Sequence, residues 1–197
     1  MRSKQISILE TAQSLFSIHG IKAVTIDEIV GECGISKKTL YVYFPTKHAL
    51  VVSVMESILS KLEHTLKMTP LVSPSAIIEL QRFFEDLQKN FVKLTYRFLN
   101  DIRVYCLEAY QKFIQFLDCN IPLYMAQNIN RGKREGLYRT ELEDTASAGL
   151  YVWMLKNILH DGLFEDEYHR IDFIKGLNSF FLKGLLSSNG QKMIISK

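Results

Sequence analysis

Residues 34–44, GISKKTLYVYF, place cationic and aromatic side chains close together. The polar members are Lys37, Lys38, Thr39, Tyr41 and Tyr43. Lysine can bind a phosphate or the O6 and N7 atoms of guanine, threonine can bond a base edge, and a tyrosine hydroxyl can donate to a phosphate. The pattern therefore indicates a surface that reads a DNA groove. An ordinary solvated surface is the alternative for such a patch taken alone.

The flanking residues predict a helix, a tight turn and a second, short helix. Thr25, with Glu28 three positions later, forms a capping-box pattern, and Gly34 favours the end of that helix. Ser36 can cap the next helix, which must stop before Pro45. This order is that of a helix-turn-helix motif, whose second helix enters the DNA major groove.

The spacing within the short helix separates a buried face from an exposed one. Leu40 and Phe44 lie four positions apart and are expected to pack inward. Lys37 and Tyr41 share a different face, which is then open to solvent. We expect this face to be the part of the motif that contacts DNA.

The first 67 residues resemble the DNA-binding domain of the TetR family of bacterial transcriptional repressors. The likeness rests on residues 8–51, and above all on CGISKKTLYVYF, which matches the family's Gly-hydrophobic-Ser-x-x-Thr-Leu-Tyr-x-Tyr-Phe followed by x-x-Lys-x-x-Leu. The resemblance implies two groups of DNA contacts. Bases and phosphates would be contacted by Lys37, Lys38 and Thr39. The DNA backbone would be held by Thr25, Tyr41, Tyr43 and Lys47.

Beyond this motif, apolar residues recur at helical spacing along nearly the whole chain. Further helices are predicted over 47–67, 75–92, 96–104, 107–135, 144–161 and 170–187. Pro122 either kinks the long central region or follows a new helix start capped by Asn120. We expect an all-α protein of about nine helices, with a frayed polar tail over residues 187–197.

The segment 68–75, MTPLVSPS, is the best candidate for a domain boundary, because it holds two of the four prolines. We expect a helix-turn-helix DNA-binding domain over 1–47 and a linking helix over 47–67. A larger ligand-binding and dimerisation domain is expected over 68–197.

Aromatic residues are frequent in the C-terminal part, where packing in a core is the first interpretation. A ligand cavity is the second, because pockets in helical bundles are lined in this way. The candidates for such a pocket are Phe84, Phe98, Tyr105, Tyr110, Phe113, Tyr124 and Trp153.

The last two predicted helices carry broad apolar stripes. The candidates for a dimer interface are Leu150, Met154, Ile158, Ile174, Leu177 and Phe181. These stripes either face the protein's own core or meet a second copy. TetR-like proteins pair the corresponding helices in a four-helix dimer bundle, and a twofold dimer would present two short reading helices to a palindrome.

Composition and motifs exclude several other classes. The net charge is only +3, and the three cysteines show no zinc or disulfide spacing. We expect no enzyme, cofactor, metal or membrane span, and a cytoplasmic location. The predicted function is a ligand-responsive repressor that binds a palindromic operator as a homodimer and is released by a small molecule. The alternatives are a helical ligand-binding or scaffolding protein without DNA-binding activity, and an enzyme on the same scaffold.

Overall fold

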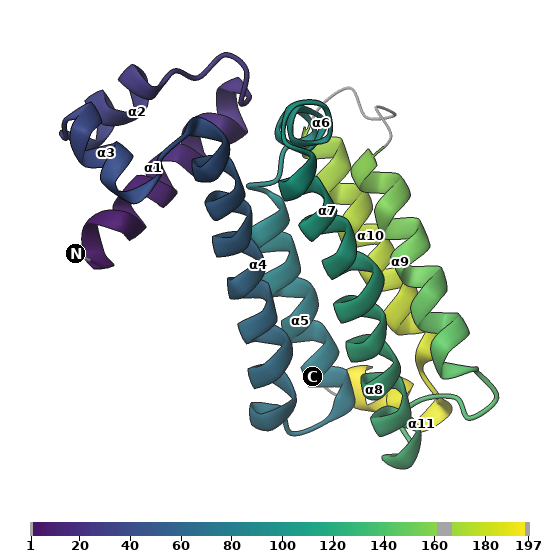
Figure 1. The fold of residues 1–197 in the computed structure, drawn as a ribbon. Helices are drawn as coiled ribbons and strands as arrows, with labels where there is room; N and C mark the ends of the chain where they lie inside the picture. Colours follow the sequence, from purple (N-terminus) through teal and green to yellow (C-terminus); the bar gives the residue numbers. More distant parts are fainter. Residues whose placement is uncertain (1, 161–166, 196–197) are drawn as a thin grey trace. The chain divides into compact units, whose positions relative to one another are not determined.

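In the computed structural model, which describes residues 2–160 and 167–195, nearly all of the chain is helical (Figure 1). The predicted all-α class is confirmed. Among the described residues, β-type pairing is limited to one isolated bridge between Tyr138 and Leu186. No described helix combines the length and apolar character that crossing a bilayer requires.

The chain forms two compact units that each take two segments of the sequence. Unit 1 joins Met1–Lys61 to Phe91–Ile114. Unit 2 joins Leu62–Asn90 to Gln115–Lys197. The helices α4, α5 and α7 carry the chain from one unit into the other.

Unit 1 contains the predicted helix-turn-helix. Its helices are α1 (Arg2–His19), α2 (Ile26–Cys33), α3 (Lys37–Tyr43), the first part of α4 (Lys47–Val72), α6 (Tyr96–Tyr105) and most of α7 (Leu107–Gln115). Helix α1 packs against α2 and against α6. Phe16 and Phe98 stack between α1 and α6 with ring centroids 6.4 Å apart. This core is the base on which α2 and α3 are mounted.

Unit 2 is a bundle around α9. Its helices are the end of α4, most of α5 (Ala76–Phe91), the π-helical turn η1 (Phe116–Asn120), α8 (Ile121–Arg134), α9 (Asp144–His160), α10 (Glu167–Leu185) and α11 (Ser188–Ile195). Helix α9 packs against both α8 and α10, and α9 and α10 run side by side in Figure 1. The Tyr151 ring lies 5.5 Å from Phe84 and 5.0 Å from Phe181, so aromatic side chains fill the middle of the bundle.

Helix α4 continues through part of the predicted boundary and ends at Val72, with Pro70 inside it. The expected end near residue 67 is therefore wrong. Distant arginines supply the donors that its last carbonyl groups need. Arg131 donates to the carbonyl oxygen of Pro70 at 3.3 Å and to that of Ser73 at 2.9 Å. Arg82 donates to the carbonyl oxygen of Val72 at 2.9 Å.

The central region contradicts one of the two predicted alternatives, the fresh helix start at Asn120, while the predicted kink at Pro122 stays a prediction. A π turn covers Phe116–Asn120 and leads directly into α8, so the helical path is not interrupted. Asn120 makes no side-chain cap bond, and the predicted fresh start capped by this residue is wrong. Pro122 lies in the first turn of α8, directly after the π turn, so its missing N–H is accommodated within a continuous helical path.

The tail is folded as α11, so the expected fraying is wrong for residues 188–195. The backbone N–H of Ser187 donates to the carbonyl oxygen of Leu137 at 2.9 Å, and the Gly190 N–H donates to Ser187 Oγ at 3.2 Å. These bonds hold the tail on the loop that precedes α9. Helix α9 is described to His160, and residue 161 of its predicted range lies outside the described residues.

Candidate DNA-binding surface

The capping box predicted at the start of α2 is formed. Thr25 Oγ1 accepts from the Glu28 N–H at 3.2 Å, and the Thr25 N–H donates to Glu28 Oε2 at 2.6 Å. The Thr25 hydroxyl also donates to this carboxylate at 3.0 Å. The hydrogen bond from the Thr25 backbone holds the pKa of Glu28 below its usual value, so the carboxylate stays ionised. Both polar groups of Thr25 are thus engaged, and its contact with the DNA backbone stays a prediction.

The turn between α2 and α3 depends on Gly34, whose φ of 62° lies in the left-handed region that favours glycine. The N–H groups of Gly34 and Ile35 donate to Gly31 and Val30 at 3.2 and 3.0 Å. Ser36 Oγ then accepts from the Thr39 N–H at 3.1 Å and caps α3. The sequence signals placed this turn and this cap correctly, because both are made by neighbouring residues.

Helix α3 has one buried and one exposed face. Leu40 and Phe44 are buried, and the Phe44 N–H donates to the Leu40 carbonyl at 2.9 Å where the helix ends. Lys37 and Lys38 are exposed, and Tyr41 keeps 44% of its surface accessible. The cationic and aromatic side chains thus share the solvent side of a helix whose other side is fixed in the core of unit 1.

An acidic residue of α2 meets this surface, which the sequence did not indicate. Asp27 lies 2.9 Å from the Lys37 ammonium, and both side chains are exposed. The hydrogen bond from Lys37 to Asp27 raises the pKa of the lysine. Lys38 forms no ion pair within the part of the chain that the structure describes. The pairing depends on how α2 packs on α3, and no local pattern reports that packing.

Lys47 is directed toward the loop between α1 and α2. Its ammonium donates to the carbonyl oxygen of Ile21 at 2.5 Å and to that of Val24. Burial lowers the pKa of Lys47. The backbone N–H of Lys22 in the same loop donates to Asp101 of α6 at 3.2 Å. Lys47 therefore fixes the approach to α2, while its predicted contact with the DNA backbone stays a prediction.

The aromatic residues predicted for a ligand pocket are divided between the units. Unit 1 holds Phe98, Tyr105, Tyr110 and Phe113, and unit 2 holds Phe84, Tyr124 and Trp153. Tyr105 and Trp153 are exposed, whereas Phe98 and Phe113 are fully buried. Phe84 and Tyr124 join one aromatic cluster through Phe83, whose ring lies 5.7 and 4.7 Å from theirs.

A polar residue missed by the sequence reasoning lies in the core of unit 2. The Tyr151 hydroxyl donates to Asn178 Oδ1 at 2.8 Å. Asn178 Nδ2 is buried and has no hydrogen-bond partner among the described residues. A single asparagine within the apolar stripe of α10 is the signal that could have found it, because a buried amide needs partners for both its ends.

The candidate interface residues divide by exposure. Ile174, Leu177 and Phe181 are buried within unit 2, whereas Met154 and Ile158 are half-buried. The exposed apolar side chains of α9 and α10 include Leu150, Trp153, Phe173 and Phe180, and we call these four the outer face. The stripe that can meet another molecule is therefore rotated from the predicted one on α10.

Residues 8–54 match the sequence profile of the bacterial regulatory proteins of the tetR family. The HTH-type transcriptional regulator YuxN of Bacillus subtilis is 44% identical over 55 residues, which are 28% of this chain and 19% of YuxN. The chain thus covers about a fifth of that relative's length. The segment matched by the profile contains α2 and α3.

Two further proteins are similar over most of the chain. The HTH-type transcriptional regulator YdgC of Bacillus subtilis is 24% identical in an alignment 172 residues long that covers 80% of this chain and 82% of YdgC. A transcriptional regulator of Cytophaga hutchinsonii has a crystal structure that superposes with a TM-score of 0.70, over 91% of this chain and 97% of that one. With 19% identity, this likeness shows a common fold.

Proposed function

Because the chain belongs to the TetR family of bacterial regulatory proteins, we propose that it is a cytoplasmic transcriptional repressor. In this proposal it binds a palindromic DNA operator as a homodimer and is released by a small-molecule effector. The solvent-facing side of α3 is the observation that carries the proposal, since a cationic-aromatic face on a core-anchored short helix has the chemistry of a groove reader. An enzymatic role is not part of it.

The DNA contacts are proposed to centre on α3. Lys37, Lys38 and Thr39 would contact bases and phosphates, with Tyr41 and Tyr43 on the DNA backbone. Thr25 and Lys47 would contribute at the edge of this surface, mainly by fixing the start of α2 and the loop before it. Residues 1–47 are then the DNA-binding domain, and 68–197 hold the effector and dimer surfaces.

The outer face of α9 and α10 supports the homodimer. The side chains of Leu150, Trp153 and Phe180 are 54, 63 and 70% exposed. Burying each of them would lower the free energy, because apolar surface would be removed from water. Large exposed apolar patches on a protein mark interaction surfaces, and these side chains lie on two helices that pack against each other. Pairing two copies through this face would join two α3 helices in one protein and permit readout of an inverted repeat.

The effector site is proposed in the core of unit 2, next to Asn178. The amide oxygen is held by Tyr151, so the amide nitrogen must donate elsewhere. An unsatisfied buried donor costs about 1–3 kcal/mol, and an acceptor atom of an effector would remove that cost. Phe84 and Phe181, in ring contact with Tyr151, would supply the apolar part of the site.

Selection of duplexes from a random DNA pool tests the proposal and identifies the operator in the same experiment. The purified chain should enrich an inverted repeat whose half-sites lie one helical turn apart, about 34–36 Å. Binding should weaken steeply with salt, because lysines displace counterions from phosphates. A protein lacking both α3 lysines, Lys37→Gln with Lys38→Gln, should enrich nothing.

Two results would favour a helical ligand-binding or scaffolding protein instead. One is the absence of enrichment by the folded wild-type chain. The other is enrichment that salt does not affect and that the double lysine variant retains. Circular dichroism of each preparation establishes that the helices are intact before either result is interpreted.

A further inference from the structure

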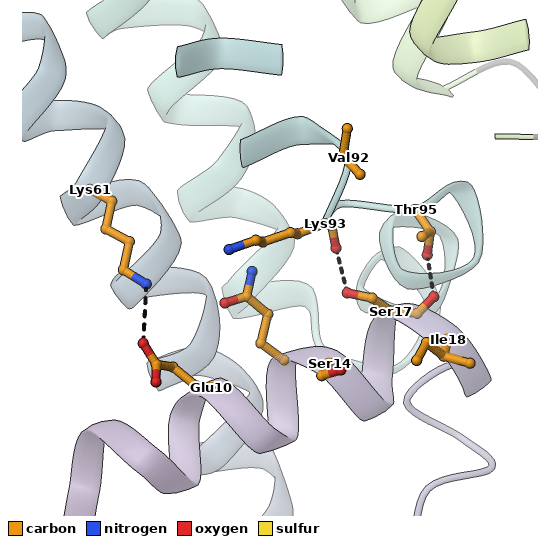
Figure 2. A pocket seen from close by; sticks show the side chains of 9 residues that line it. Glu10, Ser14, Ser17, Ile18, Lys61, Val92, Lys93 and Thr95 are labelled. Carbon is orange, nitrogen blue, oxygen red and sulfur yellow. Dashed lines mark hydrogen bonds and ion pairs between the residues drawn. The ribbon is translucent and has the colours of Figure 1, made fainter. Parts of the chain in front are cut away.

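A cavity of about 420 Å³ opens in unit 1 beside the last turns of α1 (Figure 2). Its walls come from α1, from Lys61 of α4, and from the turn between α5 and α6. This volume falls within the range of about 300–1,000 Å³ that small-molecule sites occupy. Its lining includes no residue of α3 and none of the residues assigned above to the effector.

The charged side chains of this cavity favour an anion. Lys61 extends from α4 to a carboxylate oxygen of Glu10, at the long distance of 4.0 Å, and Lys93 extends from the α5–α6 turn toward α4 (Figure 2). The lining thus holds two ammonium groups and one carboxylate, which leaves one positive charge. The exposed pair of Lys61 and Glu10 is weak, so a ligand anion can compete with Glu10.

The same cavity carries aliphatic side chains that are open to solvent. Ile18 of α1 and Val92 of the turn are 62 and 46% exposed, and both line the cavity. Apolar surface next to surplus positive charge fits a ligand that has an anionic head and an aliphatic chain. We propose that this cavity binds a small aliphatic monocarboxylate, with the carboxylate between Lys61 and Lys93 and the chain against Ile18 and Val92.

A ligand in this place would contact two hydrogen-bonded elements of unit 1. Ser17 Oγ donates to the Lys93 carbonyl, and Thr95 Oγ1 donates to the Ser17 carbonyl at 2.8 Å (Figure 2). Thr95 Oγ1 also accepts from the Phe98 N–H at 3.2 Å and so caps α6. The site therefore joins the end of α1, which supports the helix-turn-helix, to the first turn of α6.

Binding of octanoate to the full chain tests this site directly, with NMR signals of the Ile18 and Val92 methyl groups as the reporters. Octanoate should shift these signals to saturation, and octylamine at equal concentration should not. Lys93→Gln should weaken octanoate about tenfold or more, the effect of losing one charge-assisted contact. Glu10→Gln should tighten it, because the competing carboxylate is removed.

Lys112→Gln is the matched control, since Lys112 forms another cross-helix ion pair in unit 1, with Glu56 at 3.0 Å, and lies outside the cavity. Its octanoate affinity should equal that of the wild type. Three results would overturn the site: no methyl shift at millimolar octanoate, equal shifts with octylamine, or equal affinities of the Lys93 and Lys112 variants.

Glu10→Gln keeps the test decisive if Lys93→Gln does not fold, because weaker or unchanged octanoate binding in the Glu10 variant would also contradict the proposed head-group position. The assay contains no DNA. Its failure would therefore leave the proposed repressor function standing, and a failure of operator selection would leave this site standing.

Discussion

Lys38 is the residue of α3 on which operator binding should depend most directly. It is exposed and has no ion pair within the described chain, whereas Lys37 is held by Asp27. Lys38→Ala should weaken operator binding by about 1–3 kcal/mol and relax the sequence preference if the lysine contacts a base. Fluorescence anisotropy with the selected duplex and its base-substituted versions measures both effects.

Lys67→Ala is a suitable control for Lys38→Ala, because Lys67 is an exposed lysine of α4. This variant should bind like the wild type. Equal losses in the two variants would show that general charge, rather than a contact made by α3, governs the affinity.

Asp27 should lower the affinity of the protein for DNA. Its carboxylate faces the Lys37 ammonium and would stand near the phosphates that Lys37 approaches. Asp27→Asn should tighten binding to all duplexes several-fold and steepen the dependence on salt, because one more cation becomes available to phosphates. Anisotropy titrations across a range of salt concentrations test this.

Glu32→Gln, at an exposed position of the same helix, makes the same change in net charge. Its effect on affinity should be clearly smaller. Weaker DNA binding by the Asp27→Asn variant would contradict this prediction. It would show instead that Asp27 orients Lys37 for its contact with DNA.

At the scale of elements, α3 depends on its anchor in the core. A helix of seven residues is not stable by itself, so its conformation depends on packing through Leu40 and Phe44. Leu40→Ala should lower the free energy of unfolding by about 2–5 kcal/mol and abolish operator binding. Urea unfolding followed by circular dichroism measures the first effect.

Val42→Ala provides the comparison on the exposed side of the same helix. Its free energy of unfolding should stay within about 0.5 kcal/mol of the wild type. A loss as large as that of Leu40→Ala would contradict the assignment of the two faces.

The elements that the sequence predicted well are those fixed by their neighbours. The Thr25 capping box, the Gly34 turn and the Ser36 cap each involve residues a few positions apart, and all three were found. The extension of α4 depends on Arg131, which lies 58 positions beyond Ser73, and α11 depends on the carbonyl of Leu137. Local patterns cannot report such contacts.

The candidate site shows the same division. The faces of α3 follow from helical spacing, and the positions of Leu40 and Lys38 agree with it. The partners of Lys37 and Lys47 depend on how α2 and the preceding loop pack. Sequence patterns therefore did not predict the ion pair of Lys37 with Asp27. They also did not predict the hydrogen bonds from Lys47 to the carbonyl groups of Ile21 and Val24.

At the scale of the whole molecule, the outer face should determine the oligomeric state. Phe180→Glu places a charge in the middle of the proposed dimer contact, where burying it without a partner is costly. The variant should sediment as a monomer in analytical ultracentrifugation and should lose most of its affinity for the full inverted repeat.

Leu71→Glu is the matched control, because Leu71 is also an exposed apolar residue but lies on α4. This variant should remain dimeric. A dimeric Phe180 variant, or a wild-type chain that is monomeric at micromolar concentration, would exclude the outer face as the contact.

Helical spacing identified α9 and α10 as rich in apolar residues but did not settle which stripe faces inward. In the structure, Ile174, Leu177 and Phe181 are buried, whereas Phe180 is exposed to solvent. Periodicity cannot choose between two apolar faces of one helix, because the choice depends on what the helix packs against.

The apolar nature of the outer face has a consequence for a cell that is cold or makes little of this protein. The hydrophobic association of apolar surfaces weakens on cooling, because it is largely entropic in origin near ambient temperature. Subunits joined through Trp153 and Phe180 would part more readily in the cold. In the proposed homodimer, two copies must also meet before a palindrome is occupied, so at low concentration the proposed repression would scale with roughly the square of copy number.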